Sequence, residues 1–194
     1  MKNRLLLIII AVVVLFFIWG FSGYNSLVDK QEAATTALSN VQVQYQRRAD
    51  MMPQLAKIVK GYARHEKETF EAVTKARSAA TQIHLDVDNL TPEKMKAYEA
   101  AQSQVSQALS KLLAVVEAYP ELKADKNFHS LQIQEEGTEN RIGEARRNYN
   151  EAVQDYNKKV RHFPMSLIAS ICGFDKMEKF TASPQAEKAP DLDI

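Results

Sequence analysis

The chain opens with an unbroken apolar run, Leu5 to Phe21, that passes directly into a long helical pattern. About 17 residues make roughly 26 Å of helix, and extension to Tyr24 reaches the roughly 30 Å of a bilayer core. The run is longer than the apolar stretch of about 7 to 15 residues in a signal peptide, and it ends in aromatic residues typical of a membrane interface. We therefore expect a retained transmembrane helix over residues 5–24. A cleaved signal peptide is the alternative.

The charges that flank this run predict its orientation. Lys2 and Arg4 precede it, whereas the following flank mixes Asp29, Lys30 and Glu32. The positive-inside rule then places the N-terminus in the cytoplasm and the rest of the chain outside it.

Composition favours helices behind this anchor. About 170 residues follow it, enough for one domain with a hydrophobic core. Six glycines and six prolines are few for a turn-rich β fold of this length. The 25 basic and 24 acidic residues leave a net charge of +1, which provides no basic field for nucleic acid. The single cysteine excludes an internal disulfide.

Two segments in the second half of the chain carry the clearest helical patterns. Thr91 and Pro92 suit the N-cap and first position of a helix, and apolar positions then recur every three or four residues as far as Tyr119. Pro120 pushes the residue before it out of the helical region, which ends this helix. A second seam with the same spacing covers residues 125–163.

The first half is less regular. One apolar face continues from Tyr24 to Ala49. We expect Pro53 to break or kink this helix and Asp50 to cap the next one, whose apolar positions extend to Val87.

Four such helices with short connections predict an all-α fold, an antiparallel up-and-down four-helix bundle over residues 25–164 behind the transmembrane helix. Residues 1–4 are a short basic N-terminus. We expect residues 165–180 to form a short apolar helix. Residues 181–194 are rich in Ala, Pro and Asp and are expected to be disordered.

One charged residue falls on the seam of residues 125–163, where apolar residues are expected. Glu135, beside Gly137, falls on this seam, where a charge is costly unless it is paired or hydrated. We expect Glu135 to lie at a bundle end, to meet a basic partner or to mark an irregularity. The basic pairs at 47–48 and 146–147 are most simply solvated, or bonded to nearby glutamates such as Glu144.

The pattern Tyr-Asn-x-x-Val occurs three times, beginning at Tyr24, Tyr149 and Tyr156. The last two copies are one heptad apart, so both tyrosines lie on the seam and both Asn150 and Asn157 lie beside it. The simpler interpretation is that the tyrosines fill the core while the asparagines bond a neighbouring helix. The alternative is a face that binds a partner.

No catalytic or metal-binding pattern stands out. No glutamate is followed by histidine three residues later, as di-iron bundles require. His65-Glu66 is half of a zinc metalloprotease motif, but Thr69 replaces its second histidine. Cys172 follows an apolar run and is expected to be a small buried hydrophobe. We therefore predict no enzyme, no cofactor and no metal site.

Several blocks, in the same order, resemble the LemA family. They are Arg47–Pro53, Val59–Glu66 with Ala76-Arg77, Tyr119–Ala124, Asn127-Phe128, Thr138–Asn157 and Phe163-Pro164. The chain departs from the family pattern at Met51 and Met52, where leucine and isoleucine are usual, at Gln54, where asparagine is usual, and at Glu135, where leucine is usual.

The resemblance implies a single-pass bacterial membrane protein with a helical bundle behind its anchor, and it implies no reaction. We therefore expect the chain to reside in the bacterial cytoplasmic (inner) membrane. Members are often encoded near other envelope membrane proteins, which points to a partner rather than a substrate. The candidate interaction or structural residues are Tyr24, Asn25, Arg48, Asp50, Pro53, Tyr62, His65, Glu66, Glu139, Asn140, Arg141, Arg146, Tyr149, Asn150, Tyr156 and Asn157.

Two hypotheses follow. The favoured one is a non-enzymatic interaction or scaffold module that contacts the bilayer through residues 5–24 and binds an envelope membrane protein or a second copy of itself. The alternative is a sensor that binds a small molecule or peptide in the bundle core.

Overall fold

The structure, a computed structural model, describes residues 2–181, with side-chain surroundings for all of these except residues 2–5, 12 and 88. Over these residues it is all-α, as predicted, with six α-helices rather than four and one 3₁₀ turn, Val87–Asn89. The α-helices are α1 (Lys2–Tyr62), α2 (Lys67–Gln82), α3 (Pro92–Glu117), α4 (Pro120–Lys123), α5 (Lys126–Arg161) and α6 (Met165–Cys172).

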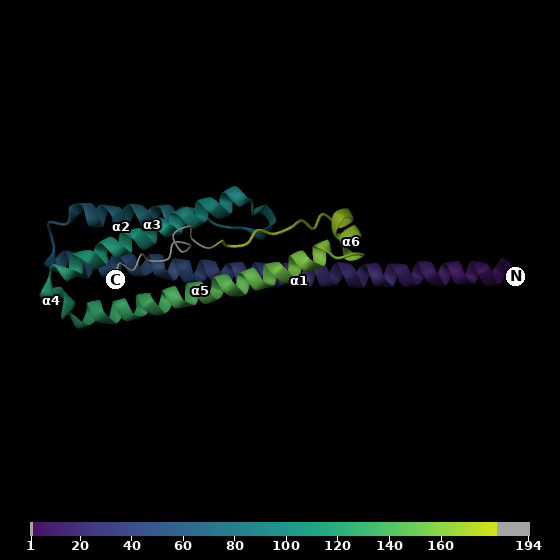
Figure 1. The fold of residues 1–194 in the computed structure, drawn as a ribbon, viewed down its shortest axis with the longest axis horizontal. Coiled ribbons are helices and arrows are strands. Elements are labelled where there is room, and N and C mark those ends of the chain that lie inside the picture. Colours follow the sequence, from purple (N-terminus) through teal and green to yellow (C-terminus); the bar gives the residue numbers. More distant parts are fainter. Residues whose placement is uncertain (1, 182–194) are drawn as a thin grey trace, which may run out of the picture.

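The first helix, α1, is 61 residues long, or about 92 Å at about 1.5 Å per residue. Its N-terminal part extends alone beyond the other helices (Figure 1). An 18-residue window there has a mean hydropathy of 2.8, and only 6% of it is buried, so α1 is long and apolar enough to cross a membrane. The helix then continues past Tyr24 without a linker.

Pro53 lies inside α1, so of the two expected outcomes, a break or a kink, the break is wrong. Proline removes one helical hydrogen bond and crowds the preceding turn. Pro53 is exposed, while Met52, Leu55 and Val59 on the opposite face are at most 1% exposed, and their burial offsets this cost. The break occurs instead at residues 63–66, between α1 and α2.

The remaining long helices run alternately back and forth beside α1 (Figure 1). We call residues 25–181 the helical body. Its most extensive helix pair is α1 with α5, followed by α2 with α3. The predicted starts of the two later helices are confirmed: Thr91 accepts a hydrogen bond from Lys94 N, and Asp125 accepts from Asn127 N and Phe128 N.

The predicted helix over residues 165–180 is correct only for Met165–Cys172. Gly173 ends α6 in the left-handed conformation, with φ of 77°, and the chain then continues without helix to Thr181. In Figure 1 this segment turns back from α6 along the helical body. We call residues 174–181 the C-terminal strap. The expected disorder of residues 181–194 falls, apart from Thr181, outside the described residues.

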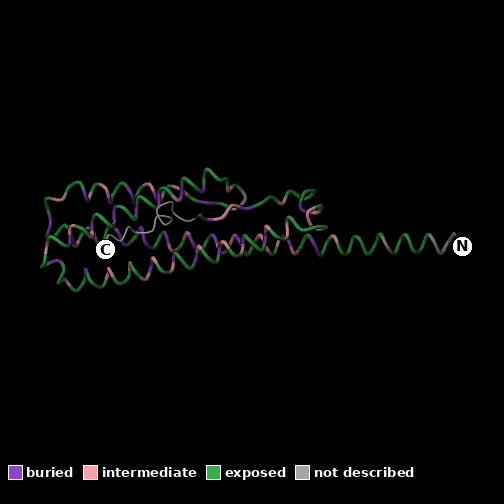
Figure 2. The backbone as a smooth tube through the Cα atoms, in the orientation of Figure 1, coloured by how far each residue is buried: buried purple, intermediate pink, exposed green. Residues whose placement is uncertain are grey.

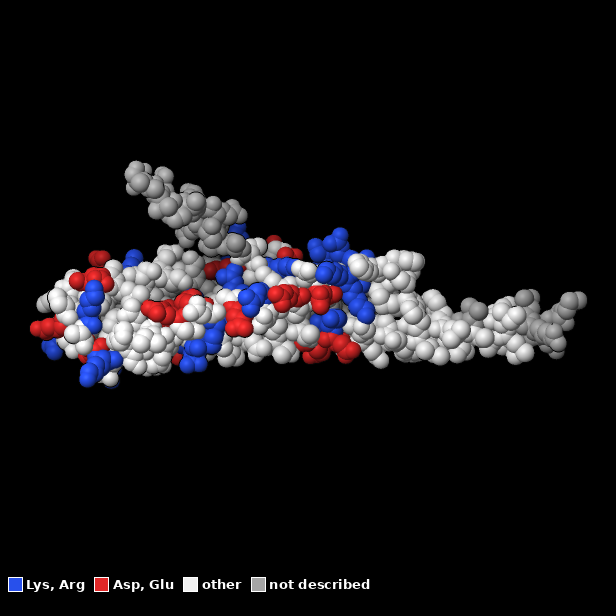
Figure 3. All heavy atoms as spheres, turned by 60° about the horizontal axis from the view of Figure 1, so that its bottom comes forward, with Lys and Arg blue, Asp and Glu red and all other residues white. Residues whose placement is uncertain are grey.

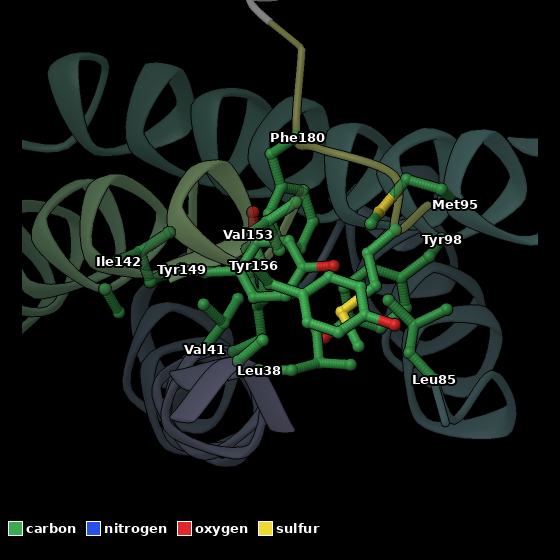
Figure 4. Close-up of a cluster of buried hydrophobic side chains, with 14 residues drawn as sticks. Leu38, Val41, Leu85, Met95, Tyr98, Ile142, Tyr149, Val153, Tyr156 and Phe180 are labelled. Atoms are coloured by element: carbon green, nitrogen blue, oxygen red, sulfur yellow. The ribbon is translucent and has the colours of Figure 1, made fainter. Parts of the chain in front are cut away.

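The buried residues, purple in Figure 2, recur along the body, and they form two clusters. The proximal cluster, next to the anchor, contains Ala34, Leu38, Val41, Tyr45, Leu85, Met95, Tyr98, Ile142, Ala145, Tyr149, Val153, Tyr156, Met177 and Phe180 (Figure 4). The distal cluster contains Met52, Leu55, Val59, Ala63, Val73, Ala76, Ala80, Val105, Ala108, Leu109, Leu112, Val116, Leu122 and Phe128.

Candidate functional site

A buried arginine lies between the two clusters. Arg48, from α1, is only 3% exposed. Its Nη1 donates to Glu139 Oε1 of α5 at 2.5 Å and to Ser106 Oγ of α3 at 3.1 Å. Its Nη2 donates to both the main-chain and the side-chain oxygen of Gln102, each at 3.0 Å. The guanidinium also lies over the Tyr45 ring, 5.1 Å from its centroid. One side chain therefore joins three helices through charge-assisted hydrogen bonds.

Of the two expectations for the basic pairs, solvation is wrong for Arg48, which instead bonds a glutamate, Glu139. Arg146 bonds a glutamate, as expected, but the partner is Glu99 on α3, at 3.3 Å, rather than Glu144. Arg147 is the exposed member of its pair and lies 4.0 Å from Glu151. Residues adjacent in sequence face different sides of a helix, and the sequence alone does not show which side faces the core.

Two glutamates one turn apart on α5 border the arginine. The Glu139 side chain is 42% exposed, so the ion pair reaches solvent on its acidic side. Burial, and then the charge of Glu139, raise the pKa of Glu135, while the charge of Arg48 lowers it. Glu135 lies within the unbroken α5, so it marks no irregularity of this helix. The charge of Arg48 acts on Glu135, but among the described residues the two form no ion pair.

A pocket of about 660 Å³ opens beside this arrangement. Its walls come from α1, α3, α5 and the C-terminal strap, and they carry charges of both signs. The charged lining residues are Arg48, Lys96, Glu99, Glu139, Arg146, Glu178 and Lys179. Burial raises the pKa of Tyr98 and of Tyr45, and Tyr45 also lines the pocket.

The C-terminal strap is bound to α5 by two asparagine side chains. Asn150 Nδ2 donates to Phe180 O at 3.0 Å, and Asn150 Oδ1 accepts from Phe180 N at 2.9 Å. Asn157 makes the same pair of bonds with Met177, both at 2.9 Å. Each amide thus satisfies a donor and an acceptor of the strap main chain, as a neighbouring strand would.

The spacing of these amides matches the rise of the strap. Asn150 and Asn157 are separated by seven helical residues, or about 10.5 Å along α5. Met177 and Phe180 are separated by three extended residues, or about 10 Å. The heptad repeat of α5 and the three-residue step of the strap therefore stay in register.

The tyrosines of the same motif complete this contact. Tyr149 is fully buried, its hydroxyl donates to Glu178 O at 2.8 Å, and its ring meets Phe180 edge-on with centroids 5.2 Å apart. Tyr156 is 1% exposed in the same cluster. The tyrosines therefore fill the core as expected. The asparagines, however, bond an extended segment of the same chain rather than a neighbouring helix.

Arg146 fastens the end of the strap. Its Nη2 donates to Thr181 O at 2.7 Å, and its guanidinium lies 5.1 Å from the Phe180 ring centroid. Glu99 accepts from Thr181 N at 3.1 Å. The ion pair between α3 and α5 therefore also binds the strap.

The first copy of the motif lies where the anchor meets the body. Tyr24 is 40% exposed and meets the Phe174 ring edge-on, with centroids 5.5 Å apart. Asn25 is exposed. This copy therefore supports the start of the strap, and only the two later asparagines bind its main chain.

Another predicted set lies at the far end of the body. Tyr62 Oη donates to Asp125 Oδ2 at 2.9 Å, which joins the end of α1 to the start of α5. Backbone hydrogen bonds, from Phe128 above all, lower the pKa of Asp125. His65 and Glu66 lie in the connection between α1 and α2, where Glu66 precedes the first helical residue without capping it through its side chain.

The other candidate residues lie apart from these contacts. Asp50 does not cap a helix, because α1 is unbroken there; it accepts from Gln46 at 2.9 Å. Asn140 is exposed on α5. Arg141 donates to Thr138 Oγ1 at 3.0 Å. The structure thus brings together around the pocket and strap the candidates Arg48, Glu139, Arg146, Tyr149, Asn150, Tyr156 and Asn157, with Tyr24 at the start of the strap, and it disperses the rest.

Within the described residues, no group of three or more His, Cys, Asp or Glu is placed to hold a metal ion. The expectation for Cys172 is wrong: it is the last residue of α6 and is exposed.

Sequence reasoning missed the partners of Arg48 and Arg146. Gln102 is the one polar residue on the otherwise apolar seam that ends at Tyr119, whereas Glu99 and Ser106 lie off that seam and carry no such signal. The interruption at Gln102 was a usable signal, because a buried amide requires hydrogen-bond partners.

Comparison with known sequences identifies the family of this chain. The sequence model of the LemA family matches residues 37–193. The chain belongs to the LemA family. Protein LemA of Metamycoplasma hominis is 27% identical over 179 residues, which cover 92% of this chain and 78% of that protein.

Other LemA-family relatives have a different name. Magnetosome protein MamQ 2 of Paramagnetospirillum magneticum is 26% identical over 202 residues, covering 95% of this chain and 74% of the relative. Magnetosome protein MamQ of Magnetospirillum gryphiswaldense is 25% identical over 181 residues, covering 84% and 66%. The matched residues include Arg48 with its partners on α3 and α5, and the residues of α5 that bind the strap.

Proposed function

We propose that this LemA-family chain is a membrane-anchored, non-enzymatic interaction or scaffold module of the bacterial cell envelope. One observation carries the proposal: α1 passes from the apolar run into the helical body as a single helix. Without a flexible linker, the anchor sets both the location and the direction of the body. The names of the relatives do not specify a reaction.

A stiff stalk is useful when a partner must be met at a fixed height. The part of α1 from Gly23 to Tyr62 is about 60 Å long at about 1.5 Å per residue. Its buried face is packed against α5 along much of this length, so the stalk and the body move as one unit. The partner would be another envelope membrane protein or a second copy of the chain.

The experiment compares two insertions of the same flexible Gly-Ser tetrapeptide. One is placed between Phe21 and Ser22, before the body begins. The control is placed between Arg64 and His65, two exposed residues of the α1–α2 connection. Cross-linking in membranes should recover a reproducible partner or homo-oligomer with the parent chain and the control, and a much lower yield with the first insertion. Equal yields, or no reproducible partner for the parent chain, would contradict the proposal.

We also propose that the N-terminus lies inside the cytoplasm and the body outside. The positive-inside rule counts only basic residues that lie near the transmembrane helix in the sequence. Basic residues that folding brings close to the C-terminal end of the apolar run therefore do not count. An exposed position far from the anchor provides the test, Ser110→Cys in a Cys172→Ser background. A membrane-impermeant maleimide should label the new cysteine in intact spheroplasts, and labelling only after lysis would reverse the orientation.

The second candidate function is a sensor, favoured by the pocket of about 660 Å³ beside Arg48. Arg48 Nε is buried and makes no hydrogen bond within the described residues, so a ligand oxygen would satisfy it. Native mass spectrometry of the full chain should then show a bound small molecule. Ser103→Trp, which fills the pocket lining, should remove it, whereas Gln104→Trp beside it should not. An unliganded parent chain would count against the sensor.

A further inference from the structure

The short helix α6 is fixed against α1 at the point where the apolar run ends. A Cβ atom on Gly23 would lie 2.6 Å from Met165 Cε, so the Met165 side chain packs closely against α1 at this glycine. The adjoining Tyr24 and Phe174 rings meet edge-on. If residues 5–24 cross the bilayer, as the proposed function requires, α6 is therefore held at the level of the membrane interface.

The outer face of α6 and Phe163, in the turn before it, are exposed and apolar. Leu167 is 57% exposed and Ile171 85%, and their spacing of four residues places these two on one side of α6; Phe163 is 81% exposed. The buried Ala169 lies on the body side. Figure 3 shows uncharged surface continuing from the anchor onto this end of the body. The stripe of Phe163, Leu167 and Ile171 beside a membrane anchor fits the apolar boundary of a bilayer.

Basic side chains gather immediately behind the stripe. A pocket of about 650 Å³ is lined by residues of α5 and the strap. Its charged and titratable lining residues are Lys158, Arg161, His162, Lys176, Glu178 and Lys179. Within the described residues, Lys158, Arg161 and Lys176 form no ion pair with a carboxylate. The blue atoms beside the white anchor end in Figure 3 show that basic residues gather there.

The height of these residues matches the headgroup layer. Lys159, on the same turn of α5, donates through Nζ to Ser26 Oγ of α1. Ser26 follows Phe21 by five residues, or about 7.5 Å along the helix. The headgroup layer is roughly 5 to 8 Å thick on each side of a hydrocarbon core of about 30 Å. Apolar side chains of α6 thus lie at the hydrocarbon boundary and the ammonium groups at the phosphates.

We infer that the corner between α5 and α6 is a second membrane contact, in which the stripe of Phe163, Leu167 and Ile171 enters the bilayer interface and the adjoining basic pocket binds the headgroup phosphate of an anionic phospholipid. This contact rests on the proposed anchor. It would hold the body at a set tilt, because the bilayer then touches it at two places. A second copy of the chain is the competing occupant of the stripe.

The single cysteine reports on this contact in the full chain. Cys172, next to Ile171, is labelled with a nitroxide and the chain is reconstituted in vesicles of phosphatidylcholine, with or without phosphatidylglycerol. In the anionic vesicles, a water-soluble nickel relaxant should reach the label at least about threefold less well than in neutral ones, because the interface screens groups buried about 5–10 Å deep. The reference is Ser110→Cys in a Cys172→Ser background, an exposed position far from the anchor.

Two variants separate the parts of the contact. Lys158→Gln with Arg161→Gln should abolish the difference between the two lipids, and so should salt at about 1 M, which shortens the screening length to about 3 Å. Leu167→Ser with Ile171→Ser should leave the label accessible in both. These side chains are exposed, so the substitutions spare the core.

Three outcomes would overturn the inference. They are equal accessibility of Cys172 in the two lipids, accessibility equal to that of the Ser110→Cys reference, and shielding that depends on protein concentration, which would assign the stripe to a second copy. Failure of the chain to float with vesicles would instead refute the anchor itself, so the two failures are distinguishable.

Discussion

The proximal and distal halves of the helical body are closed in different ways. The distal cluster is almost entirely aliphatic and is enclosed by helices. The proximal cluster contains four buried tyrosines and is completed by segments that are not helical, the α2–α3 connection with Leu85 and the strap with Met177 and Phe180.

Side-chain amides hold both of these segments. Gln42 makes the same two-bond contact with Leu85 that Asn150 makes with Phe180 and Asn157 with Met177, at 3.0 and 3.3 Å. Helices satisfy their own main-chain groups, whereas an extended segment over a core must find partners elsewhere. Polar side chains in the proximal half therefore provide main-chain hydrogen-bond partners that the helices of the distal half do not need.

The largest effect should come from the distal cluster. Leu112 is fully buried on α3, and Leu112→Ala removes apolar contacts and leaves a cavity. We expect a loss of about 2–5 kcal/mol in the free energy of unfolding. Urea unfolding followed by circular dichroism measures it. The exposed Leu167→Ala on α6 is the control, and an equally small loss for both would show that the distal half is not a close-packed core.

Arg48→Met tests the layer between the halves. The methionine keeps much of the apolar stem but leaves the Gln102 oxygens and Ser106 without their donor. We expect a loss of about 2 kcal/mol, below the 3–5 kcal/mol typical of a broken buried pair, because Glu139 is partly solvated. Glu139→Gln, which keeps an acceptor, should cost less. A loss for Arg48→Met of under about 0.5 kcal/mol would remove its structural role.

Asn150→Ala tests the proximal half. It removes two hydrogen bonds of the strap, and we expect a loss of about 1–2 kcal/mol together with faster hydrogen exchange at Phe180. Exchange in the distal part of α3 should not change. The neighbouring exposed Asn148→Ala is the matched control. If both halves opened together, the division into two regions would be wrong.

Tyr149→Phe removes one hydroxyl and keeps the ring in the cluster. The lost bond to Glu178 O should cost about 1 kcal/mol, less than the loss of the Asn150 amide. Urea midpoints of the two variants, compared at equal slope, rank them. The opposite ranking would indicate that the phenol, rather than the amide, holds the strap.

The smallest effect is a pH dependence at Glu135. Its pKa is raised in the folded chain, so the folded state binds the proton more tightly than the unfolded state does. The stabilisation that protonated Glu135 contributes is therefore complete at low pH. It is lost as pH rises from the pKa of Glu135 in the unfolded state through its pKa in the folded state. Glu135→Gln should flatten this fall, whereas Glu136→Gln, exposed beside it, should not. A rise in stability over the same range would reverse the sign.

Local chemistry explains which parts of the fold were predictable. Thr91, Asp125 and Pro120 act within one turn of their own positions, so the boundaries of α3 and the start of α5 follow from the sequence. The seam residues Tyr98 and Leu112 are buried as their spacing indicates.

The predictions that are wrong concern positions whose structure depends on contacts with distant parts of the chain. Packing of α1 against the rest of the body overrides the local preference of Pro53, and the strap leaves the helical state because Asn150 and Asn157 bind its main chain. Two asparagines one heptad apart indicate a polar stripe on α5, but their spacing does not tell whether a helix or an extended segment covers it. Only the fold brings Arg48, Gln102 and Glu139 together.

Hydrogen exchange of the full chain in lipid nanodiscs tests the central claim most directly. If α1 is one stalk and the strap closes the proximal half, amides from Ser22 to Lys30 and those of Met177 and Phe180 should all be protected in the parent chain. Asn150→Ala with Asn157→Ala should release only the two strap amides. Rapid exchange between Ser22 and Lys30, or at Met177 and Phe180 in the parent chain, would contradict the account.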